Sequence, residues 1–176
     1  ESALDRIKRV GPLSDIEAVS IIEKVTNICD SLHKSKPPIL LNGLSLDNIM
    51  FDLSSGSEEI MLRNLINLRN FEGSFKFNHI DGVSPFLIST ESFNNVFTPK
   101  SDQFNIGALL FNLIEGIPPW FVEKHTNLNN SEEVDVFLDN RNTPLNFLNN
   151  QDDHLKNLIT KSLDSSSDNR FDSLNS

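Results

Sequence analysis

Hydrophobic residues recur at a spacing of three and four over positions 16–32, the period of a helix buried along one wide face. The run opens with Ser14 and, three residues later, Glu17. Their side chains can satisfy each other's exposed amides as a capping box. Two prolines at 37 and 38 end the pattern, so the sequence predicts a helix from Ser14 to about Lys34. A shorter helix, roughly 4–10, precedes it.

After these prolines the pattern predicts a small β-hairpin. Residues 48–53 and 59–63 are short apolar runs separated by the Ser- and Gly-rich residues 54–57, which favour a turn. Because two strands alone are only marginally stable, we expect them to lie on the helices. Residues 64–97 carry scattered phenylalanines among Gly, Ser and Asn, and they predict either a long ordered loop or a segment that awaits a partner.

A third helix, apolar on most sides, is expected in the centre of the domain. Thr98 and Pro99 provide an N-cap and a first-turn proline, and the apolar residues 104–114 follow. Two further segments, 131–139 and 155–163, predict a short acidic helix and an amphipathic helix. The pattern as a whole indicates a mainly α domain.

Composition narrows the class of protein. The chain has 176 residues, enough for one domain, and a net charge of −10, which opposes binding to nucleic acid. The single cysteine, Cys29, excludes an internal disulfide and predicts a buried small hydrophobe in a cytoplasmic protein. We expect no membrane span. The start at Glu1, without Met or a targeting segment, predicts that the chain is part of a longer one.

Read in order, these segments resemble the C-terminal lobe of a eukaryotic protein kinase. Residues 41–51 (LNGLSLDNIMF) stand where a kinase has His-Arg-Asp-Leu-Lys-Pro-Glu-Asn-Ile-Leu-Leu. Residues 64–66 and 89–91 occupy the places of Asp-Phe-Gly and Ala-Pro-Glu, and 98–120 resembles the central helix and its proline-rich exit. The resemblance covers nearly the whole chain and implies a mainly α, protein kinase-like C-lobe with a small β-hairpin and a long activation-segment-like loop. Residues 1–176 would form this lobe, without the N-lobe.

The resemblance also shows where this chain departs from the family. Gly43 replaces the catalytic-loop aspartate, Ser45 the lysine that steadies the phosphoryl group, and Asn64 the metal-holding aspartate; Asn48 is retained. A positioned base contributes roughly 10²–10⁴-fold in rate. We therefore predict that the chain has no catalytic residues and is not an enzyme. We also predict that it has no cofactor, since binding of ATP and Mg²⁺ is not expected. The four histidines lack ligand spacing, so no metal site is expected.

Three retained residues have structural roles by resemblance. Glu91 and Arg170 are expected to form a buried ion pair that stabilises the lobe. Asp102, at the start of the central helix, is expected to accept backbone N–H bonds from the loop around residues 41–42, in a position that also suits the helix dipole.

The first functional hypothesis is a catalytically inactive pseudokinase that acts as a protein-interaction scaffold or allosteric regulator. Its partners would be other proteins, such as an active kinase or a signalling complex, bound through residues 71–97 or 131–139. One alternative is a divergent Ser/Thr protein kinase with Asp47 or Asp52 as base. Another is a nucleotide-sensing kinase-like domain with residual ATP binding at Asn48 and Asn64.

Overall fold

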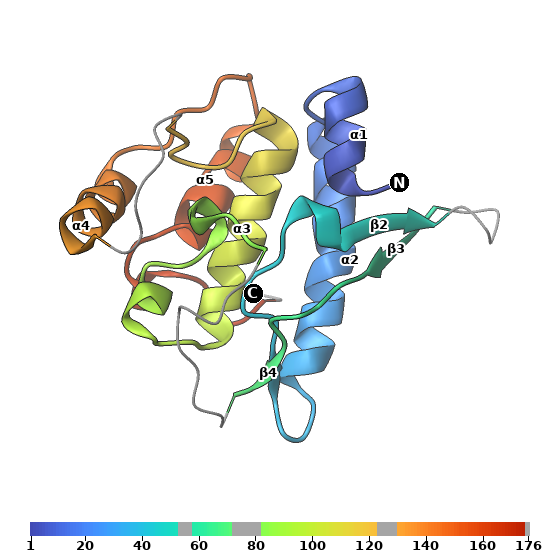
Figure 1. The fold of residues 1–176 in the computed structure, drawn as a ribbon. Helices are drawn as coiled ribbons and strands as arrows, with labels where there is room; N and C mark the ends of the chain where they lie inside the picture. The colour runs from blue at the N-terminus through green and yellow to red at the C-terminus, as the bar shows by residue number, and fades with distance from the viewer. Residues whose placement is uncertain (53–57, 72–81, 123–129, 175–176) are drawn as a thin grey trace.

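Helices dominate the computed structural model, which describes residues 1–52, 58–71, 82–122 and 130–174 (Figure 1). The helices are α1 (Ala3–Val10), α2 (Asp15–His33), α3 (Pro99–Glu115), α4 (Ser131–Asp139) and α5 (Asp153–Ser162). The strands are β1 (Ile39–Leu40), β2 (Ile49–Asp52), β3 (Glu59–Leu62) and β4 (Arg69–Asn70). This architecture confirms the predicted mainly α class with a small hairpin.

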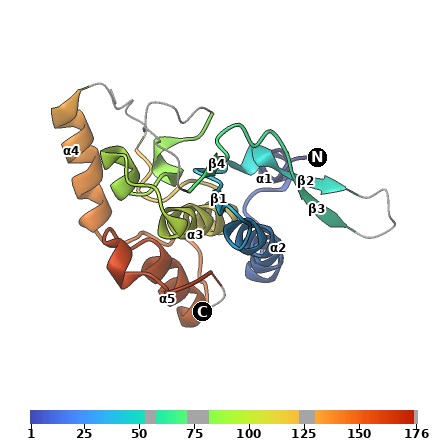
Figure 2. The same cartoon turned by 90° about the horizontal axis from the view of Figure 1, so that it is seen from below.

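The core is built around α3, which lies between α2 and α5 (Figure 2). Every residue of α3 from Ser101 to Glu115 is buried, as the sequence predicts for a helix apolar on most sides. Phe104, Leu109 and Leu113 are fully buried. From α2, the buried residues Ile21, Val25 and Cys29 belong to the same core. The central helix therefore carries the polar residues near its N-terminus into a buried environment.

Local sequence signals set the ends of these helices. The Ser14 hydroxyl accepts a hydrogen bond from the backbone N–H of Glu17 at the start of α2. At the start of α3 the backbone N–H of Thr98 donates to the Ser101 hydroxyl at 3.1 Å, and Pro99 occupies the first turn. Gly116 ends α3 at a φ of 76°, a left-handed conformation that glycine adopts without strain. The predicted starts of α2 and α3 are therefore correct.

Two antiparallel strand pairs flank the helices. β2 pairs with β3 from Ile49 opposite Leu62 to Asp52 opposite Glu59, which is the predicted hairpin; its turn lies outside the described residues. β1 pairs with β4 through two residues on each strand, too few to give a periodic signal in the sequence. In the predicted loop the described part contains 3₁₀ turns at Pro85–Leu87 and Glu91–Asn94. Within the four described ranges, no helix is long and apolar enough to cross a membrane.

Candidate kinase-like site

Asp102, in the first turn of α3, holds the backbone that leads into the loop at residues 41–48. It is 1% exposed. Its Oδ2 accepts the N–H of Leu41 at 2.9 Å, and its Oδ1 accepts the N–H of Asn42 at 3.0 Å. A buried carboxylate is tolerated only where donors surround it. The structure thus places Asp102 where the resemblance implies.

Asn105, one turn further along α3, is a second buried support that the sequence analysis missed. Its Oδ1 accepts the N–H of Leu44 at 2.8 Å. Its Nδ2 donates to the carbonyl oxygens of Leu44 at 3.0 Å and Leu87 at 2.9 Å. Asn105 therefore joins the loop to the segment that precedes residue 91. Its i, i+3 spacing from Asp102, within the mostly apolar run 104–114, is the signal that could have identified it.

Of the kinase-motif positions 43, 45, 48 and 64, the last three lie together. The Oδ1 of Asn48 accepts the N–H of Ser45 at 2.7 Å and its hydroxyl at 3.0 Å. The Nδ2 of Asn48 donates to the carbonyl oxygens of Arg63 at 3.1 Å and Asn64 at 3.4 Å. Asn48 thus bridges the loop and the end of β3. Position 64 has a φ of 54°, a left-handed conformation in which Asn and Asp are enriched.

Gly43, at the place of the catalytic aspartate, has a backbone suited to glycine. Its φ is 103°, and a Cβ there would lie 3.3 Å from Cγ1 of Val83. Asp47 and Asp52 are the candidate catalytic bases predicted from the sequence. Asp47 is exposed, and Asp52 lies at the end of β2, opposite Glu59. Positions 43, 45, 48 and 64 carry no carboxylate, so their side chains give Mg²⁺ no anionic ligand.

Glu91 and Arg170 form a bidentate ion pair, with Nη1–Oε1 2.8 Å and Nη2–Oε2 2.9 Å. The Ser101 hydroxyl donates to Oε1 of Glu91 at 2.9 Å. Burial acts to raise the pKa of Glu91, but the hydrogen bonds and charge of Arg170 outweigh it, so this pKa lies below its ordinary value. The pair links the segment after residue 89 to the C-terminal part of the chain.

Arg141, which the sequence analysis did not single out, is buried against the same segment. Its Nη1 donates to the Thr90 hydroxyl at 3.2 Å, and its Nη2 donates to the Pro85 carbonyl at 2.8 Å. Its guanidinium lies 5.0–5.3 Å from the ring centres of Phe93, Phe104 and Phe137. Burial lowers the pKa of Arg141 to about 9. A buried arginine has no periodic signature, so no pattern in the sequence indicates this role.

Several known protein kinases are similar to this chain in sequence or in fold. Calcium-dependent protein kinase 11 of Arabidopsis thaliana is 22% identical over 125 residues, 70% of this chain and 24% of that protein. The probable serine/threonine-protein kinase samkB of Dictyostelium discoideum is 29% identical over 110 residues, 61% of this chain and 18% of that protein. No family model matches. The PK-1 kinase of Cydia pomonella granulovirus superposes with a TM-score of 0.74 at 15% identity, covering 96% of this chain and 62% of that chain.

The chain has the fold of a protein kinase C-terminal lobe. Its curated relatives named above are protein kinases, and this kinase-like lobe spans about a quarter of the length of the first of them. The predicted resemblance and fold class are therefore confirmed.

The comparisons correct one prediction. From Gly43, Ser45 and Asn64 we predicted that the chain is not an enzyme, yet the relatives are named as protein kinases, which are enzymes. That finding contradicts the prediction, which is therefore wrong. Substitutions at three positions were an insufficient basis, because the amino acid at a position does not reveal which other groups serve the reaction.

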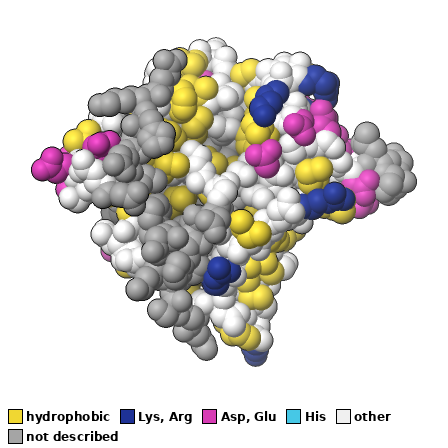
Figure 3. Space-filling view, in the orientation of Figure 1, with side chains coloured by type: hydrophobic (Ala, Val, Ile, Leu, Met, Phe, Trp, Pro, Cys, Tyr) yellow, Lys and Arg dark blue, Asp and Glu magenta, His cyan; other side chains and the backbone are white. Residues whose placement is uncertain are grey.

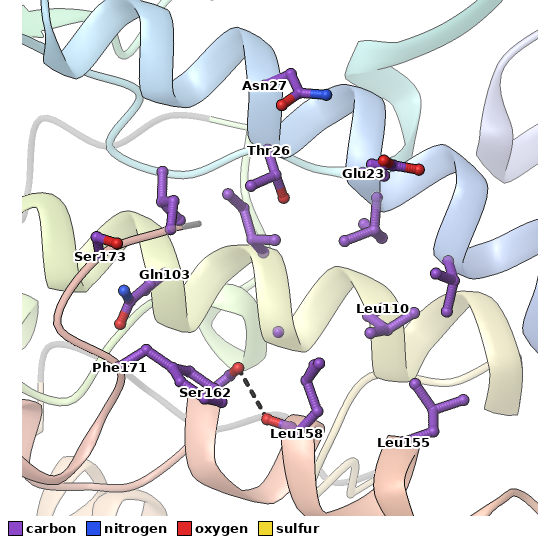
Figure 4. A pocket seen from close by; sticks show the side chains of 15 residues that line it. Glu23, Thr26, Asn27, Gln103, Leu110, Leu155, Leu158, Ser162, Phe171 and Ser173 are labelled. Carbon is purple, nitrogen blue, oxygen red and sulfur yellow. Dashed lines mark hydrogen bonds between the residues drawn. The ribbon is translucent and has the colours of Figure 1, made fainter. Parts of the chain in front are cut away.

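The kinase-like lobe also contains a cavity of about 360 Å³ between α2, α3, α5 and the C-terminal segment (Figure 4). Val19, Leu110 and Leu155 are among its apolar lining residues. Gln103 and Ser162 are its buried polar members, and the Oε1 of Gln103 has no hydrogen-bond partner among the described residues. None of the catalytic-loop positions lines this cavity, so it is separate from the kinase-like site.

Proposed function

We propose that this chain is the C-terminal lobe of a divergent Ser/Thr protein kinase. The observation that carries the proposal is the linked loop: Asp102 and Asn105 fix its backbone, and Asn48 joins it to residue 64. Phosphoryl transfer depends mostly on positioning and electrostatic stabilisation, and this framework supplies the positioning. The names of the kinase relatives support the same activity.

Because carboxylates are missing at positions 43 and 64, we expect a low rate of phosphoryl transfer. Asn64 is a neutral and therefore weaker ligand for Mg²⁺ than aspartate, and Gly43 carries no base. We propose a slow enzyme whose base is Asp47 or Asp52. That this lobe by itself does not bind ATP and Mg²⁺ stays a prediction, and nucleotide binding would depend on an N-lobe. A thermal-shift titration with ATP, with and without Mg²⁺, tests that point, because ligand at about 100 times Kd adds about 2.7 kcal/mol of stability.

The variant Asn64→Asp tests the proposed activity. The left-handed backbone at residue 64 accepts aspartate, so the variant adds a metal-binding carboxylate without backbone strain. We expect Mg²⁺-dependent transfer of labelled phosphate from ATP to rise about tenfold or more over the wild type, a rate increase that needs only ~1.4 kcal/mol. The assay uses the longest native chain that contains this lobe, on a protein substrate.

Asn142→Asp, an exposed substitution with the same charge change, is the matched control and should leave the rate unchanged. Gly43→Asp is less suitable, because the φ of 103° strains any other residue. Absence of detectable phosphate transfer from both the wild type and Asn64→Asp, in protein shown to be folded, would refute the proposal.

A protein-binding role is a second candidate, favoured by α4. This helix lies at the edge of the molecule with acidic side chains at the surface (Figures 1 and 3). Glu132, Asp135 and Asp139 are exposed, and Val136 is 65% exposed beside them. An exposed apolar side chain rimmed by charge suits a protein partner. The partner, such as an active kinase, and a cytoplasmic location stay predictions.

Two single variants, Val136→Asp and Glu132→Lys, test this second role. Comparative mass spectrometry of proteins that co-purify with wild type and variants should show loss of specific partners from both. Unchanged sets of partners would contradict a binding role for α4. Ile16→Asp on α2, another exposed apolar position, is the matched control.

A further inference from the structure

We propose that Cys29, His33 and Asp102 form a zinc-binding site between α2 and α3. The sequence predicts no ligand spacing among the histidines, but the fold brings three different ligand types together. The Nε2 of His33 lies 2.8 Å from Oδ2 of Asp102. The Sγ of Cys29 lies 3.4 Å from that nitrogen and 3.8 Å from that oxygen. The proposal does not depend on kinase activity.

These three separations match the size of a metal ion. A point about 2.0 Å from all three atoms exists at the centre of the triangle they form, and Zn²⁺ binds His nitrogen and carboxylate oxygen at about 2.0–2.2 Å and Cys sulfur at about 2.3 Å. An ion slightly above the plane of the three atoms satisfies these lengths with small side-chain shifts. The fourth tetrahedral position is then left for a water molecule.

The ligand types and their charges favour zinc over Mg²⁺ or Ca²⁺. Thiolate and imidazole are ligands of zinc and other borderline or soft metals, whereas Mg²⁺ and Ca²⁺ take oxygen. One thiolate and one carboxylate balance the two positive charges of Zn²⁺, which removes the cost of isolated charge in a buried site. On binding, the Cys29 thiol releases its proton to solvent.

Sequence and packing together create the site. Cys29 and His33 are four residues apart on α2, which puts their side chains on one face of the helix. Asp102 reaches them from the first turn of α3. Cys29 is fully buried, whereas the His33 side chain is 11% exposed and gives the ion a route from solvent. Because Asp102 also holds Leu41 and Asn42, a bound ion would brace α2, α3 and the loop.

Cobalt substitution tests the site directly. The purified protein, freed of metal with a chelator, is titrated with Co²⁺ and then with Zn²⁺. We expect one equivalent of metal, a thiolate-to-cobalt charge-transfer band in the near ultraviolet, and loss of that band when Zn²⁺ displaces Co²⁺. A folded protein that shows no band and retains no zinc overturns the proposal.

Variants identify the ligands. Cys29→Ser should abolish the band, and His33→Gln should weaken zinc binding at least ~10-fold, since even an outer-shell partner typically contributes that much. His154→Gln, an exposed histidine of α5, is the matched control and should bind as the wild type does. Circular dichroism verifies that each variant is folded. Zinc affinity unchanged in both Cys29→Ser and His33→Gln would place the metal elsewhere and also overturn the proposal.

Discussion

Asp102 and Asn105 illustrate how single buried polar residues organise this lobe. Each offers its side chain to backbone groups of residues that lie far away in sequence, at 41–44 and 87. An unmade hydrogen bond on a buried group costs about 1–3 kcal/mol, so a loop that left these partners would lose stability. The loop conformation is therefore fixed by α3 more than by the loop's own sequence.

Loss of the Glu91 carboxylate should expose the contribution of the ion pair. Glu91→Gln leaves Arg170 buried without its counter-charge, and we expect the free energy of unfolding to fall by about 3 kcal/mol at pH 7. The pKa of Glu91 is lowered in the folded state, so its stabilisation is complete above the ordinary value of 4.5 and is lost as pH falls through the lower folded value.

Urea denaturation of wild type and Glu91→Gln at pH 7 and at about pH 3 tests this prediction. The gap in unfolding free energy should be large at pH 7 and should shrink in acid. Glu132→Gln, on the exposed face of α4, should show little change at either pH. A gap that stays constant with pH would mean that packing, rather than charge, accounts for the effect of Glu91.

At the scale of elements, the contact between α3 and α5 requires a glycine. Gly107 lies in the middle of α3, and a Cβ built there meets the Cβ of Ser162 at 2.6 Å. Helix propensity alone would favour alanine by about 1 kcal/mol. The close approach of the two helices therefore outweighs a local preference for alanine at this position.

Gly107→Ala should lower the free energy of unfolding by about 1–3 kcal/mol through overpacking, despite the better helix former. Thermal unfolding followed by circular dichroism measures the change. A second substitution, Ser162→Gly, removes the opposing Cβ and should restore part of the loss in the double variant. If Gly107→Ala instead stabilises the protein, the two helices can separate at little cost and the close packing is unimportant.

At the scale of the molecule, two buried arginines connect parts that are distant in the chain. Arg141 follows α4 and binds the segment at 85–90, and Arg170 follows α5 and binds Glu91. Both guanidinium groups lie 5.0 Å from the ring centre of Phe104 on α3. The C-terminal part of the lobe is thus attached to the activation-segment-like loop through charged side chains over one aromatic residue.

Arg141→Lys should loosen this attachment. Lysine keeps the charge but cannot present two nitrogens to Thr90 and Pro85 in one plane. We expect faster amide hydrogen exchange over residues 82–97 and a loss of about 1–2 kcal/mol in stability. Arg63→Lys, at an exposed position, should change neither. Exchange in 82–97 that matches the wild type would show that the aromatic packing holds the segment without Arg141.

The helices, their starts and the order of the kinase-like motifs could be predicted from the sequence. These features depend on periodicity and on neighbours within about four residues, such as Ser14 with Glu17 or Thr98 with Pro99. The resemblance also named Glu91, Arg170 and Asp102 before their contacts were known. The class of protein was less well determined, because the changes at Gly43 and Asn64 led to a wrong prediction about activity.

Contacts between polar groups that are distant in the sequence depend on the packing of the whole lobe. His33 and Asp102 are separated by 69 residues, and Arg141 and Thr90 by 51, so no local pattern connects them. Their contacts follow from how α2, α3 and the segment after α4 pack. Because these groups are largely buried, the loss of any of these hydrogen bonds would lower the stability of the fold. The proposed zinc site and the attachment of the loop through Arg141 are products of that packing, because side-chain proximity across a core has no sequence period.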